Sequence, residues 1–531
     1  MININALSFK YPNASNNVFT NIDCQINPGT LTLVVGASGS GKSTFLRCIN
    51  GLVPHFSGGT ISGRIDVFGS NPIKDGPEKL SSKIGFVFQE PEAQFVFDIV
   101  EDEIAFALEN MGLARKEMHA RVDEIIDRLG LTSIRKRSIH EISGGEKQKV
   151  AIASVLVTKP RVLLLDEPTS QLDPISADQI LKLCVSLKQS TGLTILISEH
   201  RLERLLPYTD NVIEMKNNHT LKSGIPREII PNMQTAPPVV EIGKKLGIIP
   251  LPLIVEDFPQ DIISEINTKI EQQQPGTDNT ESDKVLSVNH LSAVINKNPI
   301  LKDISIDLNR SEILILLGIN GSGKTSLLRS ILGLLPSAGE KYLNGKNFKD
   351  LPMAGILKQI GYLPQNPNDL LFAETILDEL QITLKNHGIE KSQSDLINFL
   401  KQFGLADKSQ DYPRDLSVGE RQRIALAAIT VHDPDIIFLD EPTRGLDYAA
   451  KNNLSLLFNR WRHSGKAILL VTHDVEFAAG FADRVAILET GKIIFTGSPY
   501  IAFTQFLAFQ TQTARIFNQQ KWTRPEDIHL T

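Results

Sequence analysis

A glycine-rich loop that could bind phosphate lies near the start of the chain, at residues 36–44. The loop reads Gly-Ala-Ser-Gly-Ser-Gly-Lys-Ser-Thr; it follows an apolar run, 31–35, that predicts a buried strand, and it precedes a predicted helix. Glycines let backbone N–H groups curl around an anion, and a helix N-terminus adds partial positive charge. Lys42 could reach the β- and γ-phosphates of a nucleotide, and the Ser43 hydroxyl could bind Mg²⁺. The candidate nucleotide-binding residues here are Gly36, Ser38, Gly39, Ser40, Gly41, Lys42, Ser43 and Thr44.

A second loop of the same kind follows the apolar run 313–317. Its candidate nucleotide-binding residues are Gly318, Asn320, Gly321, Ser322, Gly323, Lys324, Thr325 and Ser326. One such loop could be a glycine-rich strand–helix turn that binds no nucleotide. Two copies, each between a predicted strand and a predicted helix, argue for phosphate binding at both.

Other polar motifs recur in the same order after each loop, which indicates a duplicated domain. The pairs are Gln89 with Gln365, Ser143-Gly144-Gly145 with Ser417-Val418-Gly419, Asp166-Glu167 with Asp440-Glu441, and His200 with His473. Each aspartate ends an apolar strand, where a carboxylate can hold Mg²⁺ or its water. The glutamate that follows is placed to orient or deprotonate an attacking water. The alternative is that the Asp-Glu pair caps a helix. The pair occurs in both halves in the same context, which argues against that interpretation.

Composition narrows the classes of function. The chain has 531 residues, 41% hydrophobic and 22% charged, with a net charge of -6, so we expect two or more globular domains and no nucleic-acid partner. Cys24, Cys48 and Cys184 show neither disulfide nor metal spacing, and we expect each to be a small buried residue. No signal peptide opens the chain and no apolar run approaches a membrane span, so any membrane role should be peripheral.

Strand-like runs alternate with helical patterns in both halves, which predicts an α/β fold with a mostly parallel core sheet in each. A mainly helical insert is expected at about 98–140 and again at 374–412. The predicted organisation is a first domain at 1–220, an appendix at 221–270, a flexible linker at 271–283, a second domain at 284–499 and a tail at 500–531.

Taken together, the motifs resemble the ATP-binding cassette of ABC proteins, so the chain resembles two tandem ABC-type P-loop NTPase domains, each with a helical subdomain. The resemblance implies ATP and Mg²⁺ as cofactors, with Mg²⁺ bound by Ser43, Gln89, Asp166, Thr325, Gln365 and Asp440. It implies catalytic roles for Glu167, Glu441, His200, His473, Gln89 and Gln365, the histidines contacting the γ-phosphate. It also implies that the two cassettes pair within the chain, so that Ser417, Val418 and Gly419 complete the site of Lys42, and Ser143, Gly144 and Gly145 that of Lys324. Tyr11 lies where the family stacks an aromatic ring on adenine, whereas the second half has Ile295 there.

Segments 51–55, 88–96, 100–106 and 237–241 are similar to the ATPases of energy-coupling factor importers, which take up vitamins or transition-metal ions. This resemblance implies a transmembrane coupling subunit, a membrane substrate-binding subunit, and a peripheral location on the cytoplasmic side of the cell membrane. The alternatives are another ABC importer or a soluble translation-associated ABC ATPase, although the latter usually has a long charged linker. An acidic cluster after Gln89 suggests docking of arginines from the membrane partner; it comprises Glu90, Glu92, Asp98, Glu101, Asp102 and Glu103.

Overall fold

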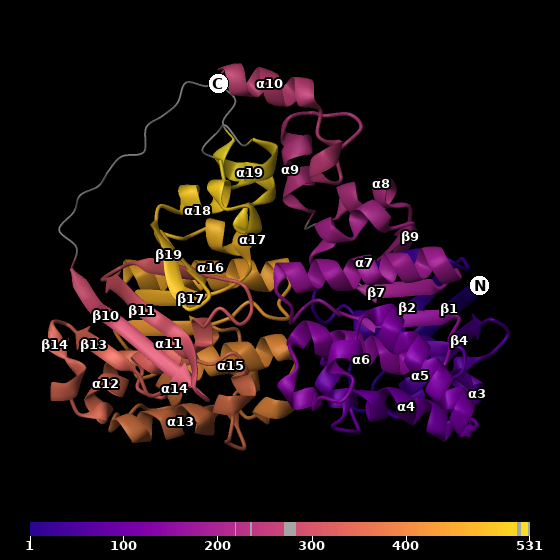
Figure 1. Cartoon of the computed structure of the whole chain (residues 1–531), viewed down its shortest axis with the longest axis horizontal. Helices are drawn as coiled ribbons and strands as arrows, with labels where there is room; N and C mark the ends of the chain where they lie inside the picture. The colour runs from indigo at the N-terminus through magenta and orange to yellow at the C-terminus, as the bar shows by residue number, and fades with distance from the viewer. Residues whose placement is uncertain (218, 234–235, 270–282, 518–521, 529–531) are drawn as a thin grey trace. The chain divides into compact units, whose positions relative to one another are not determined.

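The computed structural model describes residues 1–217, 219–233, 236–269, 283–517 and 522–528 (Figure 1). The chain folds into two compact units, Met1–Ile254 (unit 1) and Val255–Thr531 (unit 2). The boundary falls inside the segment predicted as an appendix, 221–270. All of the predicted linker except residue 283 lies outside the described residues.

The core of unit 1 is a six-stranded sheet in the order β5-β6-β7-β3-β8-β9. Its strand pairs are parallel except β8 with β9, which is antiparallel. Every residue of β3, β6 and β7 is buried, which is why these strands are continuous apolar runs and not alternating ones. The strands are β3 (Leu31–Val35), β5 (Ile84–Val87), β6 (Val162–Asp166), β7 (Thr194–Ser198), β8 (Asn211–Met215) and β9 (Leu221–Gly224).

A second sheet in unit 1, which the sequence did not predict, is antiparallel with the order β2-β1-β4. Its strands are β1 (Ile2–Lys10), β2 (Phe19–Ile26) and β4 (Thr60–Val67). Buried side chains of β1 and β2 share one apolar core with residues of β3, β6 and α1 (Lys42–Ile49). The antiparallel sheet therefore supports the phosphate loop between β3 and α1 from one side.

Unit 2 repeats this plan. Its core sheet has the order β15-β16-β17-β12-β18-β19, and its antiparallel sheet the order β11-β10-β13-β14. The core strands are β12 (Ile313–Leu317), β15 (Ile360–Leu363), β16 (Ile436–Asp440), β17 (Ala467–Val471), β18 (Arg484–Glu489) and β19 (Lys492–Gly497). The antiparallel strands are β10 (Lys284–Ile295), β11 (Asn298–Asn309), β13 (Ala338–Leu343) and β14 (Lys346–Asn347). These findings confirm the predicted fold class.

The described residues form helices in both predicted inserts, after both phosphate loops and at 144–156 and 418–430, together with further helices that the sequence analysis did not predict. In unit 1 they are α2 (Leu52–His55), α3 (Pro72–Leu80), α4 (Val100–Asn110), α5 (Arg115–Leu129), α6 (Gly144–Leu156), α7 (Pro174–Thr191), α8 (Pro226–Ile229) and α9 (Pro238–Lys245). In unit 2 they are α10 (Gln260–Lys269), α11 (Lys324–Ile331), α12 (Met353–Gln359), α13 (Ile376–His387), α14 (Gln393–Lys401), α15 (Val418–Thr430), α16 (Tyr448–His463), α17 (Val475–Ala479), α18 (Pro499–Gln505) and α19 (Gln512–Ile516). Every helix of the described residues is too short or too polar to cross a membrane.

The helical insert of each unit contains a buried glutamate in the same role. The inserts comprise α4 and α5 in unit 1 and α13 and α14 in unit 2. Glu103 accepts hydrogen bonds from the Val96 and Phe97 amides at 2.8 and 2.9 Å. Glu379 accepts from the Phe372 and Ala373 amides at the same distances. In each unit a buried carboxylate thus fixes the segment that follows the motif glutamine.

The predicted tail, 500–531, is part of the packing of unit 2. Phe503 is buried in the core of this unit, and the Phe517 ring contacts Trp522 with centroids 5.2 Å apart. Phe517 also contacts Phe258, 5.7 Å away, and Arg515 pairs with Glu256 at 2.8 Å. Residues 256 and 258, which precede the second copy of the repeat, therefore pack on its tail. All three cysteines are buried free thiols, as predicted.

Two histidines stack in unit 2, where α13 ends beside the turn between α15 and β16. The rings of His387 and His432 lie 3.9 Å apart with planes 3° apart. Both His432 ring nitrogens are buried without a hydrogen-bond partner among the described residues. Burial, and after it the neighbouring His387, lowers the pKa of His432 to about 4. Unit 1 has Thr158 at the position that aligns with His432.

We predict that His432 makes the folded chain acid-sensitive. Its folded pKa is below the usual value near 6.5, so its stabilising effect is complete above that pH and is lost as the pH falls toward 4. Wild type should lose about 1–2 kcal/mol more stability than His432→Thr between pH 7.5 and pH 5, allowing for partial solvent exposure. Urea unfolding at both pH values measures the difference. The control is the exposed His290→Thr, and equal losses in wild type and His432→Thr would contradict the prediction.

Candidate functional site

The two phosphate loops have backbone conformations that only glycine adopts easily. In unit 1, Gly36, Gly39 and Gly41 have φ of 148°, 78° and 97°, and in unit 2 Gly321 and Gly323 have φ of 78° and 105°. A Cβ on Gly36 would lie 2.4 Å from the Met215 carbonyl oxygen. All five positions therefore favour glycine for its conformation, and Gly36 also needs it for space.

Each loop lysine folds back over its own loop. Lys42 Nζ donates to the carbonyl oxygens of Gly36 and Ala37 at 2.9 and 3.2 Å. Lys324 Nζ donates to Gly318 and Ile319 at 2.8 and 3.0 Å. Both lysines are buried, so the loop holds a desolvated cation at the head of a helix, which suits a phosphate group.

The other predicted loop residues divide into exposed and buried ones. Ser38 and Asn320 are exposed at the two loop tips, and Ser326 is half-buried. Ser40 and Ser322 are buried, and their hydroxyls have no hydrogen-bond partner among the described residues. The Tyr11 hydroxyl lies 3.0 Å from Thr44 Oγ1, which keeps the ring beside the loop, whereas Ile295 is exposed.

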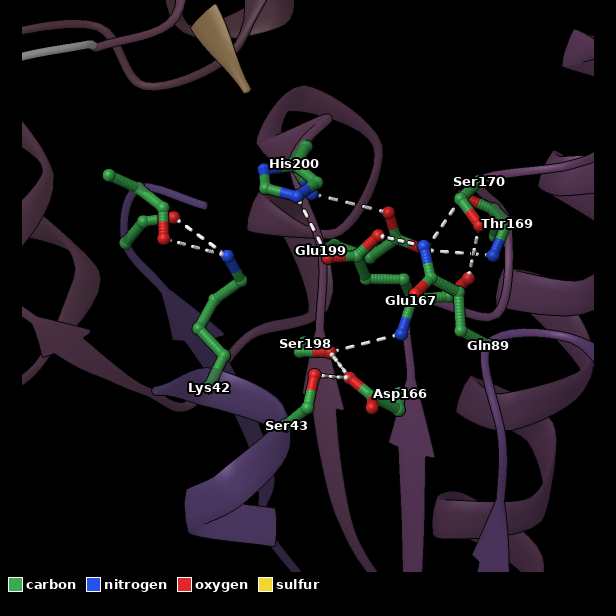
Figure 2. Close-up of polar contacts among 12 residues, drawn as sticks. Lys42, Ser43, Gln89, Asp166, Glu167, Thr169, Ser170, Ser198, Glu199 and His200 are labelled. Atoms are coloured by element: carbon green, nitrogen blue, oxygen red, sulfur yellow. Dashed lines mark hydrogen bonds and ion pairs between the residues drawn. The ribbon is translucent and has the colours of Figure 1, made fainter. Parts of the chain in front are cut away.

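A buried aspartate lies beside the hydroxyl that follows each lysine. Asp166 accepts from the hydroxyls of Ser43 and Ser198 at 3.0 and 2.8 Å (Figure 2), and Asp440 accepts from Thr325 at 2.7 Å. Burial raises the pKa of Asp166, and it raises that of Asp440 to about 6.

These residues fit a divalent cation. Oδ1 of Asp440 is buried without a hydrogen-bond partner among the described residues, so an uncompensated carboxylate oxygen lies beside a hydroxyl. A hard cation takes oxygen ligands of this kind. The described residues include no cluster of three His, Cys, Asp or Glu side chains able to hold a metal. A cation here would therefore depend on hydroxyl and phosphate oxygens as well as the aspartate.

The glutamate after each aspartate contacts the predicted histidine. Glu167 Oε1 lies 2.8 Å from His200 Nε2, and its Oε2 accepts from Gln89 Nε2 at 2.8 Å (Figure 2). Glu441 Oε2 lies 2.8 Å from His473 Nδ1. The two glutamates have φ of 47° and 53°, a conformation that is rare for residues other than glycine and is found at functional sites.

The structure thus brings together, within each unit, most of the residues that the sequence singled out. Gln365 follows β15 at the place corresponding to Gln89. Ser143 and Ser417 are the N-caps of α6 and α15, each in a capping box with a glutamate. Gly144 and Gly145 form the first turn of α6, and Val418 and Gly419 that of α15. The starts of α6 and α15 are thus separate in the chain from the phosphate loops, which precede α1 and α11.

Sequence reasoning missed the role of Glu199, between β7 and His200. This residue is 3% exposed and accepts from the Thr169 amide and hydroxyl at 2.9 and 2.7 Å (Figure 2). Burial raises the pKa of Glu199 to about 7. The available signal was the comparison of the two halves, because the second half has Thr472 at this position.

We predict that Glu199 destabilises the fold as it ionises. A carboxyl whose folded pKa lies above its usual value near 4.5 favours the protonated folded state, so stability falls as the pH rises from about 4.5 to about 7. Glu199→Gln should therefore gain about 1–3 kcal/mol relative to wild type between pH 5 and pH 8. Urea unfolding at the two pH values is the measurement. The exposed Glu228→Gln is the matched control, and the same shift in both variants would refute the assignment.

Comparison with known proteins places this site in a family. The ABC transporter family profile matches residues 19–170 and 301–444. The chain is 36% identical over 552 residues to a "Putative ABC transporter ATP-binding protein" of Streptomyces avermitilis, with 98% of each chain covered. It is 32% identical over 518 residues to the "Putative HMP/thiamine import ATP-binding protein YkoD" of Bacillus subtilis, with 95% of this chain and 93% of that one covered. A solved Clostridium perfringens structure, "cbiO1 … Part of the ABC transporter complex cbiONQ", aligns with TM-score 0.40 and 30% identity, over 51% of this chain and 95% of that one.

One family match falls in each unit, and the relatives align over nearly their whole lengths. Both copies of the repeat carry the loop lysine, the strand-end Asp-Glu pair and the histidine in contact with that glutamate. The chain therefore belongs to the ABC transporter family, as an ATPase with two ATP-binding cassettes in one polypeptide.

Proposed function

We propose that the chain is the energy-coupling ATPase of an importer of the energy-coupling factor type, acting at the cytoplasmic face of the cell membrane. The observation that carries the proposal is that both units have a full set of hydrolytic residues. A transporter that uses ATP at two sites needs this, whereas one with a degenerate site would lack part of a set.

In the proposed mechanism the lysine of each unit binds the β- and γ-phosphates of ATP, and the backbone amides of the loop hold the rest of the triphosphate. Mg²⁺, when bound, would neutralise developing charge on the phosphates. Ser43, Asp166 and Gln89 would hold it in unit 1, and the matching set in unit 2 is Thr325, Asp440 and Gln365. Burial of the aspartates supports this, because a carboxylate desolvated to this extent gains from a cation nearby.

Each glutamate would then orient or deprotonate the attacking water, while the histidine beside it contacts the γ-phosphate. The ion-pair distance of 2.8 Å in both units supports a shared role for the two side chains. We further propose that Ser143 and Ser417, at the starts of α6 and α15, complete the nucleotide site of the opposite unit. Helix starts of this kind bind anions, and hydrolysis would remove the γ-phosphate contact that joins the halves.

The substrate class we propose is a vitamin or vitamin precursor. One full-length relative carries the name "Putative HMP/thiamine import ATP-binding protein YkoD", which supports this class. Transition-metal ions are the alternative that the sequence resemblance leaves open. A translation-associated ATPase is not favoured, because the sequence of the predicted linker, 271–283, is short, polar and not basic, unlike the long charged linker of that class.

The membrane partner would dock on the segment after Gln89 and Gln365, where part of the predicted acidic cluster is already engaged within unit 1. Glu101 is occupied by Arg135, which donates two hydrogen bonds at 2.8 and 2.9 Å and lowers the pKa of Glu101 to about 2. Glu103 is buried, and Glu92 pairs with Lys147 at 2.5 Å. Glu101 and Glu103 therefore stabilise the fold of unit 1, whereas the Glu92 side chain stays 66% exposed beside Lys147, and Glu90 and Asp102 are exposed.

Exposed apolar side chains mark the surface better. Val96 and Phe97 are 63% and 41% exposed, and Phe372, which aligns with Val96, is 74% exposed. In both units the buried glutamates Glu103 and Glu379 fix the backbone at these positions. A rigid segment that presents apolar residues suits an apolar helix of a transmembrane subunit.

Replacing both catalytic glutamates tests the hydrolytic assignment. Glu167→Gln with Glu441→Gln should bind ATP as wild type does, yet hydrolyse it ~10²–10⁴ times more slowly, because removal of a general base has that effect. Phosphate release measures turnover, and equilibrium binding of a fluorescent ATP analogue measures affinity. Turnover within about threefold of wild type would remove these residues from the mechanism.

A second test addresses the partner surface. Val96→Asp with Phe372→Asp should reduce the membrane-bound share of the tagged chain in its native cells about tenfold or more, since an interface anchor typically contributes ~2 kcal/mol or more. ATPase activity of the purified chain should persist. Ile225→Asp with Leu456→Asp, exposed apolar residues elsewhere in each unit, is the matched control. Retention of the first variant on membranes would rule this surface out as the docking site.

A further inference from the structure

The two units differ in the residue that immediately precedes the histidine, Glu199 in unit 1 and Thr472 in unit 2. In unit 1 the His200 amide donates to Glu199 Oε2 at 3.3 Å, while Oε1 of the same carboxylate accepts both hydrogen bonds from Thr169 (Figure 2). Thr169 lies two residues after Glu167. Glu199 therefore ties the segment that carries the proposed base to the backbone of the histidine.

Unit 2 has no carboxylate at this position. Thr472 is fully buried, and its hydroxyl accepts from the Asp474 amide at 3.0 Å. The His473 amide donates to Glu441 Oε2 at 3.3 Å, the same oxygen that lies 2.8 Å from His473 Nδ1. One oxygen of the proposed base is thus held by both the backbone and the ring of the histidine.

The histidine amide thus donates to a different residue in each unit, and this changes which groups contact the proposed catalytic glutamate. In unit 1 Glu199 accepts the histidine amide, and the two oxygens of Glu167 contact His200 Nε2 and Gln89 Nε2. The histidines also differ in the nitrogen used, Nε2 in unit 1 and Nδ1 in unit 2. Hydrogen bonds fix the direction in which a carboxylate points. The orientation of Glu167 therefore depends on Gln89, which lies outside the segment that carries His200.

We propose that Glu199 is a positioning residue for ATP hydrolysis in unit 1, which holds the Glu167–Thr169 segment against His200 so that Glu167 is oriented by Gln89. The two sites are then unequal, because unit 2 has Thr472 in place of this positioning carboxylate. This inference rests on the proposed role of Glu167 in activating water.

The test replaces Glu199 with the residue of unit 2. In the full-length chain, Glu199→Thr should lower turnover in unit 1 about tenfold, as loss of an outer positioning contact typically does, with KM within about twofold of wild type. Turnover is resolved by site through vanadate trapping with 8-azido-ATP, photolabelling and assignment of the labelled peptides to residues 1–254 or 284–531. Unit 2 labelling should stay within about twofold of wild type.

Two further variants separate positioning from a merely structural role. Glu199→Gln keeps a carbonyl oxygen for both Thr169 bonds and loses only the longer 3.3 Å contact with the His200 amide, so it should restore unit 1 labelling to within about threefold of wild type. Thr472→Val should leave unit 1 labelling unchanged. Thermal melts accompany each variant, because a packing defect would lower the melting temperature and the labelling of both variants at Glu199 together.

Several results would overturn the inference. Unchanged unit 1 labelling in Glu199→Thr, an equal loss in both units, or an equal loss in the Thr and Gln variants would each do so. Failure of the proposed function looks different, because Glu167→Gln would then retain turnover whatever Glu199 does.

Discussion

Each unit buries a carboxylate at the carboxyl end of a central parallel strand, next to a loop that holds a buried lysine. Asp166 is 2% exposed and Asp440 is 1% exposed, and burial raises the pKa of both. Taking such groups out of water is costly unless opposite charge or hydrogen bonds compensate. The surrounding architecture follows from this constraint, because the strand ends, the glycine-rich turn and the helix start must converge for hydroxyls, lysine and cation to offset the desolvation.

The two copies satisfy this constraint with different buried polar groups. Unit 1 places Glu199 behind its histidine, whereas unit 2 has Thr472 there and pairs the buried Lys451 with Asp474 at 2.6 Å. The core sheets have the same strand order in both units, and Gly39 and Gly41 of the first phosphate loop share their positive φ with Gly321 and Gly323 of the second. After duplication, the backbone around the nucleotide sites therefore stayed the same, while the buried residues beside the histidines diverged. Such a change can give the two sites different rates of hydrolysis without inactivating either.

The sequence predicted what depends on short, local patterns. The phosphate loops, the strand-end Asp-Glu pairs and the α6 and α15 helices each occupy a few consecutive residues whose types dictate the local conformation. It could not predict that Arg135 pairs with Glu101, or that Glu199 is buried, because such contacts depend on tertiary packing and leave no periodic signal. The acidic cluster therefore resembled a docking groove although most of it is committed to internal hydrogen bonds.

The contact of Phe258 with Phe517 shows that the folded unit 2 begins before the duplicated sequence does. The duplicated sequence begins near Lys284, yet aromatic and ionic contacts from Phe258 and Glu256 cover the tail of the second copy. A recombinant fragment that starts at the repeat boundary would lose the Phe258 ring that packs on Phe517, and the apolar surface exposed in this way promotes aggregation. A soluble fragment of the second cassette should start at residue 255, and an insertion or gene fission in this protein is tolerated best upstream of that residue.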